Sequence, residues 1–475
     1  MVKMPIMGRK ENRMKKIYFL VGSQDLYGEI TLKKVIENSN KIKDYFKDQI
    51  KDVEFVGPKL VIDNDSCLAS ISEANNDLDC IGVMCFMHTF SPAKMWINGL
   101  KILNKPLLHL HTQMNVEIPY KTIDMDYMNL NQSAHGDREF GFILARMKIN
   151  HDIIVGHYED KEVITELKRF IRVCRGIDTS KHIRCAMFGN NMRDVAVTDG
   201  DRVESQIDYG WQVNYYALGD LVEEFKGIKE SEIDERYQAY LSKYTLNTDQ
   251  ILNVKEQAKY DLALERFLKK NKINAFTDTF QDLYGLNELP GLAVQSVMSK
   301  GIGFAAEGDY KTACLGTIFK SMAEGESGAT GFMENYTYDY SKEEELGAHM
   351  LEVDPSFAKG KINIEVHDLS IGNRDCPARL VFKGKDGEGV AVCMIDMGDH
   401  FRLVASEIKL VSDGESMPKL PVGSIMWKDK PTFKEGIKEW LTYGGGHHTI
   451  VSTCLTKEDI MLFAKLTNTE IKFVE

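Results

Sequence analysis

The sequence lacks several features that would assign it to a common class of protein. It has nine cysteines, an odd number, and none of them forms a C-x-x-C pair. We therefore expect free thiols in a reducing compartment rather than a disulfide framework. No stretch approaches the roughly 18 consecutive apolar residues of a membrane helix, and the apolar run at residues 17–22 is too short for the core of a signal peptide. These absences predict a cytoplasmic protein with no membrane partner.

Positive charge and nucleotide motifs are also scarce. The chain has 59 Lys and Arg against 71 Asp and Glu, a net charge of −12, which argues against nucleic acid as a partner because phosphate binding requires a basic surface. Neither G-x-x-x-x-G-K-[ST] nor G-x-S-x-G occurs, so phosphoryl transfer and triad hydrolysis lack support. A G-x-G-x-x-A at residues 301–306 follows a predicted helix and forms a predicted strand, the reverse of a dinucleotide fingerprint. The D-x-D at residues 124–126 is predicted to be a turn or strand edge.

The first part of the chain alternates between strand and helix patterns. Buried strands are predicted at residues 17–22, 53–56, 80–86 and 106–110, with amphipathic helices between them. Such alternation predicts a parallel sheet with crossover helices. One helix is expected to be capped by Thr31 and one to open at Ser91-Pro92. A third, at residues 160–174, is expected to end at Gly176, which places a domain boundary near residue 180.

The remaining chain divides again near residue 328. A second α/β unit is predicted from residue 182, with its longest helix at 251–269 and with a strand at 302–306 that delivers Glu307 to a helix at 311–322. Beyond residue 328 short strands follow one another, which predicts an antiparallel β-rich domain. With about 150 residues per domain as a guide, the predicted domains are 1–180, 181–328 and 329–475.

Chemistry-bearing side chains gather in three stretches of the second half of the chain. Residues 303–309 (GFAAEGD) run from apolar residues into Glu307, and a carboxylate at the carboxyl end of a buried strand lies where open α/β sheets bind ligands. Residues 331–336 (GFMENY) contribute Glu334, His349 follows in a small-residue setting, and three glycines precede His447 and His448. Two carboxylates and two imidazoles are a ligand set for a divalent transition metal.

Each of these residues also has a structural interpretation. The negative charge of Glu307 could stabilise a helix N-terminus through the helix dipole. A single His such as His349 is commonly packed and hydrogen-bonded. Glu352 is a second candidate carboxylate close to it in the sequence. Glu334 is in phase with three tyrosines, so we expect one shared, half-buried face on which a buried Glu needs a partner. The tyrosines are Tyr336, Tyr338 and Tyr340. The spacing 307, 334, 349 and 448 matches no short-range metal motif, so the residues alone leave both interpretations open.

Nine longer stretches resemble the L-arabinose isomerase family. They include VGSQDLYG at 21–28, HTFSPAKMWING at 88–99, MNLNQSAHG at 128–136, EFGF at 139–142 and FGNNMRDVAVTDG at 188–200. The others are LPGLAVQ at 289–295, GFAAEGD at 303–309, HMLEV at 349–353 and GGHHT at 445–449. The resemblance extends from about residue 17 to the end of the chain.

The resemblance implies a fold and an activity. The implied fold has two Rossmann-like (flavodoxin-like) parallel-sheet domains followed by a β-rich, barrel-like C-terminal domain, in a homo-oligomer that is a hexamer built from trimers. The implied activity is conversion of L-arabinose to L-ribulose, with D-galactose to D-tagatose as a slower reaction. An isomerase for a related sugar such as L-fucose, or a non-catalytic sugar-binding protein that kept the fold, remains an alternative.

The resemblance also implies the site residues. Mn²⁺ or a similar divalent cation is expected on Glu307, Glu334, His349 and His448, the second His of its pair. The two glutamates are the expected acid/base pair, and which one carries the proton is open. Substrate contacts are expected from Gln24, Leu26, Met192 and Phe280, and from His135 of the partner subunit.

The sequence departs from the family pattern in four places. Gly136-Asp137 stands where the family commonly has Gly-Gly, and Asp25 stands where a His often follows the Gln. The N-terminus is extended by a turn or two, and the C-terminus stops short of longer members, which puts in doubt any contact of a C-terminal tail at a subunit interface. The short C-terminus touches no expected metal ligand.

Overall fold

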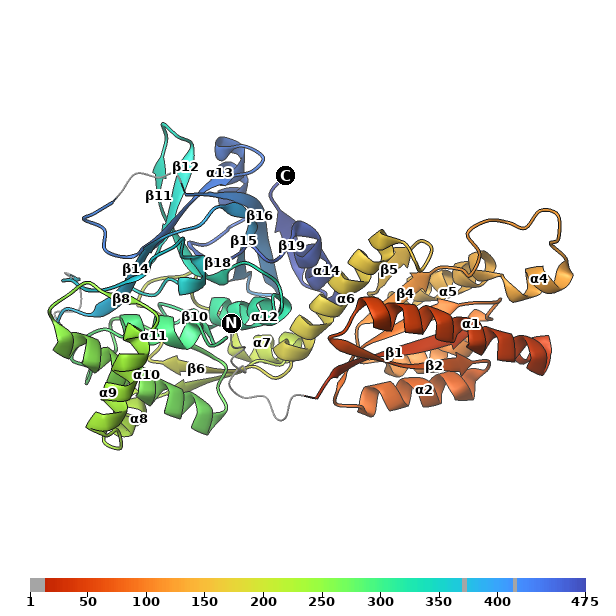
Figure 1. Cartoon of the computed structure of the whole chain (residues 1–475), viewed down its shortest axis with the longest axis horizontal. Helices are drawn as coiled ribbons and strands as arrows, with labels where there is room; N and C mark the ends of the chain where they lie inside the picture. Colours follow the sequence, from red (N-terminus) through yellow and green to blue (C-terminus); the bar gives the residue numbers. More distant parts are fainter. Residues whose placement is uncertain (1–12, 370–373, 413–416) are drawn as a thin grey trace. The chain divides into compact units, whose positions relative to one another are not determined.

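The computed structural model describes residues 13–369, 374–412 and 417–475 (Figure 1). The chain divides into two compact units, Lys10–Asp178 and Thr179–Glu475. The predicted N-terminal extension falls in residues 1–12, outside the described part of the chain. No helix within the described residues is both long and apolar enough to cross a membrane.

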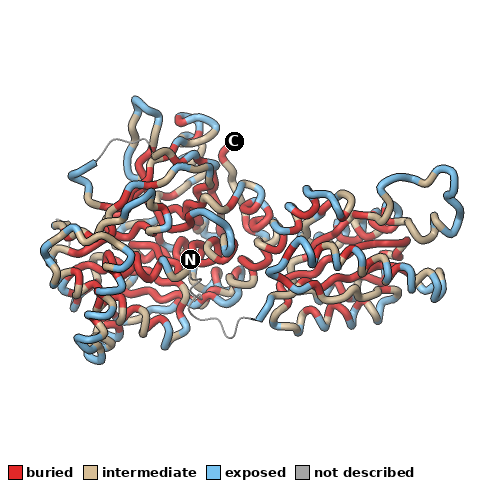
Figure 2. The backbone as a smooth tube through the Cα atoms, viewed as in Figure 1, coloured by how far each residue is buried: buried red, intermediate tan, exposed pale blue. Residues whose placement is uncertain are grey.

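The unit Lys10–Asp178 is built on a five-stranded parallel sheet with the order β2-β1-β3-β4-β5. Figure 1 shows α1 and α2 on opposite faces of this sheet, and Figure 2 shows most of its central strands β1, β3 and β4 as buried chain. The strands are β1 (Lys15–Gly22), β2 (Val53–Val61), β3 (Cys80–Met87), β4 (Leu107–His111) and β5 (Asp152–Val155). The helices are α1 (Gly28–Gln49), α2 (Asn64–Asn76), α3 (Ile97–Ile102), α4 (Met125–Leu130), α5 (Ser133–Met147) and α6 (Lys161–Ser180). The order 2-1-3-4-5 is that of flavodoxin-like folds, so the predicted class is confirmed.

Three local predictions in this unit are wrong. Helix α1 begins at Gly28, after a short 3-10 turn, so Thr31 lies inside the helix. Helix α6 continues through Gly176 to Ser180, because a helical glycine costs only about 1 kcal/mol, which burial of neighbours such as Ile177 offsets. The D-x-D at 124–126 opens α4, since the Asp124 carboxylate accepts the Tyr127 N–H at 2.8 Å as a helix cap.

The unit Thr179–Glu475 contains a second parallel sheet with the order β10-β9-β6-β7. Its strands are β6 (Arg184–Phe188), β7 (Gln212–Tyr216), β9 (Ala275–Asp278) and β10 (Gly303–Ala305). The helices are α7 (Arg202–Tyr209), α8 (Leu218–Phe225), α9 (Glu230–Leu241), α10 (Ile251–Asn271), α11 (Gly291–Met298) and α12 (Tyr310–Met322). The strand–helix order around Gly301 agrees with the rejection of a dinucleotide fingerprint, because α11 precedes it and β10 follows.

The same unit contains a closed barrel of six strands. The ring runs β16-β15-β18-β11-β12-β17 and closes where β17 pairs with β16; β19 adds to β16, and β14, β13 and β8 extend beyond β17. The ring strands are β11 (Thr330–Asp339), β12 (Glu344–Ala348), β15 (Gly387–Asp396), β16 (Phe401–Val411), β17 (Gly423–Asp429) and β18 (His448–Ser452). The added strands are β8 (Thr245–Leu246), β13 (Asn363–Val366), β14 (Ala378–Lys383) and β19 (Glu470–Phe473), and two helices complete the region, α13 (Phe433–Thr442) and α14 (Lys457–Thr467). The predicted barrel-like domain is confirmed.

A bulge in β11 overturns the prediction that Glu334 shares a face with three tyrosines. Glu334 pairs with Ala348 of β12, whereas Tyr338 pairs with Glu345, so the register slips by one residue between them. Residues 345 and 348 lie on opposite faces of β12, because strand side chains alternate. Glu334 therefore faces the interior and Tyr338 lies on the other face, whereas Tyr336, at the bulge, keeps a side-chain hydrogen bond to Glu334 and Tyr340 is exposed.

Two buried carboxyl groups meet in the barrel wall, away from the predicted ligands. Glu345 of β12 is 2% exposed, and it hydrogen-bonds Asp429 of β17, which requires a shared proton. Burial, together with the charge of Asp429, raises the pKa of Glu345 to about 8. Burial also raises the pKa of Asp429, to about 6. The two buried carboxyl groups therefore bind a proton more tightly together than isolated carboxyl groups do.

Candidate metal centre

Glu307 lies on a strained turn at the carboxyl end of β10. Its backbone has φ 61°, a left-handed conformation that costs a non-glycine residue about 1 kcal/mol. The Met192 N–H donates to the Glu307 carbonyl oxygen and the Gly308 N–H to the Asp278 carbonyl oxygen, both at 3.0 Å. A Cβ on Gly308 would lie 2.5 Å from the Asn191 Cα, so only glycine permits this close approach. The strain is held by the surrounding backbone, as is common at functional sites.

Strand pairing brings Glu334 and His448 together. The register of β11 and β18 places the two residues directly opposite each other, and their side chains meet with 3.0 Å between the Glu334 Oε1 and the His448 Nε2. The His448 Nε2 also lies 3.7 Å from the Glu307 Oε2. His448 and Glu334 are 1% and 8% exposed, so residues more than a hundred positions apart form one buried cluster.

His349 reaches the cluster from the end of β12. Its Nε2 lies 3.5 Å from the same Glu334 Oε1, because Ala348, the preceding residue, pairs with Glu334. The ring of Phe280 stacks on the His349 ring with 5.9 Å between centroids and 14° between planes. The four predicted ligands are therefore linked in the order Glu307, His448, Glu334 and His349.

Two further carboxylates orient the imidazoles. The Asp309 Oδ2 lies 3.1 Å from the His448 Nδ1, and Glu352 hydrogen-bonds the His349 Nδ1. In both histidines the Nδ1 is held by a carboxylate and the Nε2 is turned toward Glu334. A carboxylate on one ring nitrogen with the other nitrogen directed at a shared point is the arrangement of metal-ligating histidines.

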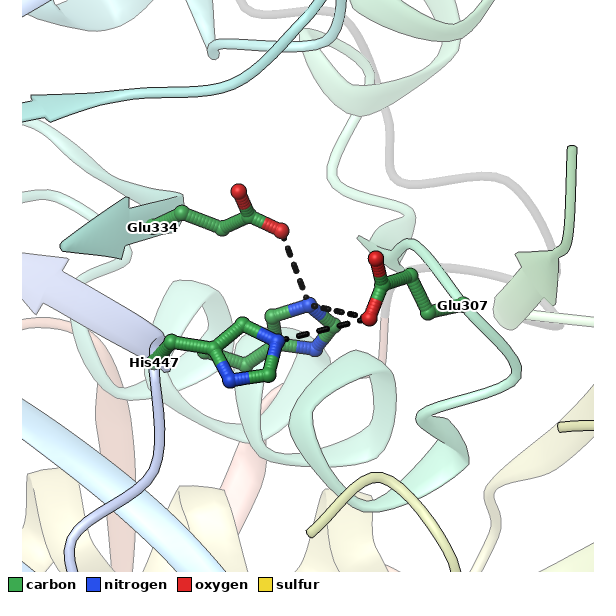
Figure 3. Close-up of side chains that lie close together, drawn as sticks. Glu307, Glu334 and His447 are labelled. Carbon is green, nitrogen blue, oxygen red and sulfur yellow. Dashed lines mark hydrogen bonds and ion pairs between the residues drawn. The ribbon is translucent and has the colours of Figure 1, made fainter. Parts of the chain in front are cut away.

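A fifth side chain, His447, also enters the cluster. Its Nε2 lies 3.3 Å from the Glu307 Oε2, and Figure 3 shows its ring facing that carboxylate. Ligand atoms of Glu307, Glu334, His447 and His448 all lie within 4.8 Å of one another. His349 falls outside that group of four, and His447 replaces it there. His447 is the more exposed of the two, with 38% of its side chain accessible against 1% for His349.

The charges in the cluster are strongly coupled. Burial opposes ionisation of Glu334, but His349 and His448 outweigh it and lower the pKa of Glu334 to about 2. Burial likewise opposes protonation of His448, but its hydrogen bonds to Asp309 and Glu334 outweigh it and raise its pKa to about 9. The pKa of Asp309 is held below its ordinary value against burial, chiefly by Lys311.

The donor set fits a divalent cation. Carboxylate oxygens and neutral imidazole nitrogens suit a first-row transition ion, and at the cluster the excess of carboxylates draws a proton onto His448 at neutral pH. A bound cation would supply this positive charge and leave the Nε2 free to coordinate, since metal binding displaces protons from its ligands. The site is thus built for a positive charge among buried carboxylates.

The predicted substrate contacts fall in both units. Met192 supports the Glu307 turn through its backbone, and Phe280 stacks on His349. Gln24, Leu26 and His135 belong to the unit Lys10–Asp178. Leu26 is 84% exposed, and the His135 ring stacks on Phe90 with 4.5 Å between centroids.

The sequence did not single out Asp309, and it named His447 only together with His448. Asp309 follows Glu307 by two positions, and it both caps α12, accepting the Thr312 N–H at 3.2 Å, and holds His448. The capping role could be predicted from D-x-x-T before an apolar helix, but the contact with His448 could not, since it joins residues 139 positions apart. From the sequence, His447 and His448 are equally good candidates for a metal ligand, because neither composition nor spacing distinguishes them.

Comparison with known proteins gives one consistent result. Family models described as the N-terminal, central and C-terminal domains of L-arabinose isomerase match residues 11–182, 184–325 and 329–470. The chain is 48% identical to L-arabinose isomerase 2 of Clostridium acetobutylicum over 98% of its own length and 97% of the relative. It is 48% identical to L-arabinose isomerase of Thermotoga maritima, over 97% and 93% of the two chains, and 47% identical to that of Oceanobacillus iheyensis, over 95% and 97%. With the fold and the Glu/His cluster already in place, these matches show that the chain belongs to the L-arabinose isomerase family of enzymes.

Proposed function

We propose that this protein converts L-arabinose to L-ribulose and, more slowly, D-galactose to D-tagatose. The observation that carries the proposal is the buried cluster of two carboxylates and imidazoles in a chain of this family. The reaction moves one hydrogen between C1 and C2 and redistributes protons on O1 and O2. A C–H beside a carbonyl is a weak acid, so a carboxylate base needs stabilisation of the developing oxyanion.

We assign the cation, Mn²⁺ or a similar divalent ion, to Glu307, Glu334, His349 and His448. His349 is preferred to His447 because its ring is buried and its Nδ1 is held by Glu352, whereas His447 contacts the Glu307 carboxylate. When bound, the ion would act as a Lewis acid toward the substrate oxygens. His447 is then left to orient Glu307.

Within this scheme Glu307 and Glu334 form the acid/base pair. One carboxylate takes the proton from one carbon and returns it to the other, through a cis-enediol. The side chains of Glu307 and Glu334 are 14% and 10% exposed, so the proton would move in a site from which most water is excluded. A hydride shift between the two carbons would use the same residues.

We further propose the surroundings of the reaction. The three domains are 1–180, 181–328 and 329–475, and the protein acts in the cytoplasm as a homo-oligomer, a hexamer built from trimers. Gln24, Leu26, Met192 and Phe280 contact the sugar, together with His135 of the partner subunit.

The test is direct. Purified protein incubated with Mn²⁺ and L-arabinose should form ketose, and rates across L-arabinose, D-galactose and L-fucose should be highest for L-arabinose. E307A should abolish turnover and leave sugar binding measurable. A folded oligomer that forms no ketose, or an E307A variant that still turns over, contradicts the proposal.

A further inference from the structure

An exposed arginine fastens together the two loops that support the Glu307 turn. Arg193 follows β6 and forms a fork with the loop after β9: its Nη1 donates to the Gln281 Oε1 at 2.9 Å and its Nη2 to the Asp282 Oδ1 at 2.7 Å. The Arg193 backbone N–H donates to the same Gln281 oxygen at 2.9 Å. Three hydrogen bonds therefore join these loops through one residue.

The loop before Arg193 is shaped around Asp282. Gly189 has φ 90°, and a Cβ there would lie 3.0 Å from the Asp282 Cβ. Asp194, directly after the arginine, has φ 67°, a conformation that costs a non-glycine residue about 1 kcal/mol. The chain thus adopts two left-handed residues within six positions to place Arg193 over Asp282.

Arg193 and Gln281, which these hydrogen bonds join, each directly follow a residue that contacts a proposed metal ligand. Met192, before Arg193, donates its N–H to the Glu307 carbonyl oxygen at 3.0 Å. Phe280, before Gln281, stacks on the ring of His349. The fork therefore ties the backbone support of one proposed ligand to the aromatic support of another.

We propose that Arg193 is a positioning residue, which fixes the Glu307 turn and the Phe280 ring by clamping the loops that follow β6 and β9. This inference rests on the proposed function, because it assigns the clamp to the geometry of that site. Arg193 itself has 63% of its side chain exposed, so the ion pair contributes little to stability. Its effect is on alignment, where a misplacement of about 1 Å can cost on the order of 100-fold in rate.

The test uses R193Q, D282N and the double variant in the full chain. A matched control is R266Q, which removes another arginine–carboxylate pair, between Arg266 and Glu232 of α10 and α9. The measurements are kcat/KM for L-arabinose at saturating Mn²⁺, the Mn²⁺ dissociation constant by calorimetric titration, and the melting temperature.

We expect R193Q and D282N each to lower kcat/KM by about 10-fold or more and to weaken Mn²⁺ binding several-fold, with melting temperatures close to that of R266Q. The double variant should be no worse than the single ones, because both break the same clamp. The inference is overturned if R193Q matches R266Q in both kcat/KM and Mn²⁺ affinity. It is also overturned if the losses multiply in the double variant, or if R193Q loses activity only together with a large fall in melting temperature.

The two proposals fail differently. If the wild-type protein forms no ketose from any aldose, the proposed function fails. The Mn²⁺ dissociation constants of R193Q and R266Q then decide the clamp by themselves.

Discussion

Replacement of Asp309 by Asn is expected to lower both Mn²⁺ affinity and stability, for two separate reasons. The Asp309 carboxylate holds the His448 Nδ1 at 3.1 Å and lies 3.2 Å from the Nζ of Lys311, a lysine with no exposed side-chain surface. D309N keeps the size and the cap on Thr312 but removes the charge. We expect Mn²⁺ affinity to fall 10–100-fold, the range found when a carboxylate behind a ligating histidine is lost, which corresponds to about 1.4–2.7 kcal/mol.

The same change leaves a buried ammonium without its carboxylate. Loss of one partner from a buried ion pair costs about 3–5 kcal/mol, and the Lys311 Nζ keeps hydrogen bonds to the carbonyls of Thr198 and Asp199, so we expect the lower end of that range. D309N/K311M should regain part of the stability, since the uncompensated charge is gone, but none of the metal affinity. Thermal melting of the metal-free proteins and Mn²⁺ titration measure the two effects separately.

Asp354→Asn is the matched control. Asp354 is also a buried cap, accepting the Ser356 N–H at 2.8 Å, and is paired with Lys320 at 2.6 Å, but it does not touch the imidazoles. D354N should lose comparable stability and keep its Mn²⁺ affinity within about threefold of the wild type, because the ligands and the carboxylates behind them stay intact. Equal Mn²⁺ affinity in D309N and D354N would refute the assignment of Asp309 to His448.

Three further outcomes are expected. The raised pKa of Glu345, about 8, means that the folded state binds its proton more tightly than the unfolded chain, so this stability is present at low pH and is lost as pH rises from about 4.5 to about 8. The side chain of E345Q stays neutral at every pH. Its free energy of unfolding should therefore fall less steeply with pH than that of the wild type across that window, by up to about 1.4 kcal/mol per pH unit, as measured by urea unfolding. If the free energies of the two proteins run parallel with pH, no proton is shared. At the turn with φ 61°, E307G should be more stable than E307A by about 1 kcal/mol, although neither turns over; an E307A variant at least as stable would remove the argument for strain. In D₂O, proton transfer by a carboxylate should introduce deuterium at C1 of the ketose, detected by NMR, whereas its complete absence would favour the hydride shift.

Local patterns predicted most of the elements that position the site. The β10–α12 passage around Glu307 was predicted within two residues, because an apolar run that ends at a carboxylate marks the strand end and the apolar residues after it continue as a helix. The strand predicted at residues 80–86 matches β3, since it is a short run of apolar residues. Errors arose where a neighbour decides the local structure, as in the packed continuation of α6 past Gly176.

Local sequence patterns did not predict that the four ligands lie close together. Glu334 and His448 meet because β11 pairs with β18, and His349 joins them because β12 pairs on the other side of β11. A one-residue bulge at Tyr336 then turned Tyr338 away from Glu334. Strand partners and bulges depend on contacts between distant segments, so the ligand set came from resemblance. The contact of Asp309 with His448 and that of His447 with Glu307 were found only in the fold.

The most direct test of the account is the position of a bound ion. Crystals of the protein grown with Mn²⁺ should show an anomalous difference peak bonded to Glu307, Glu334, His349 and His448, with Asp309 and Glu352 on the far sides of the two imidazoles. A peak located elsewhere, or no peak at this cluster under saturating Mn²⁺, would contradict it.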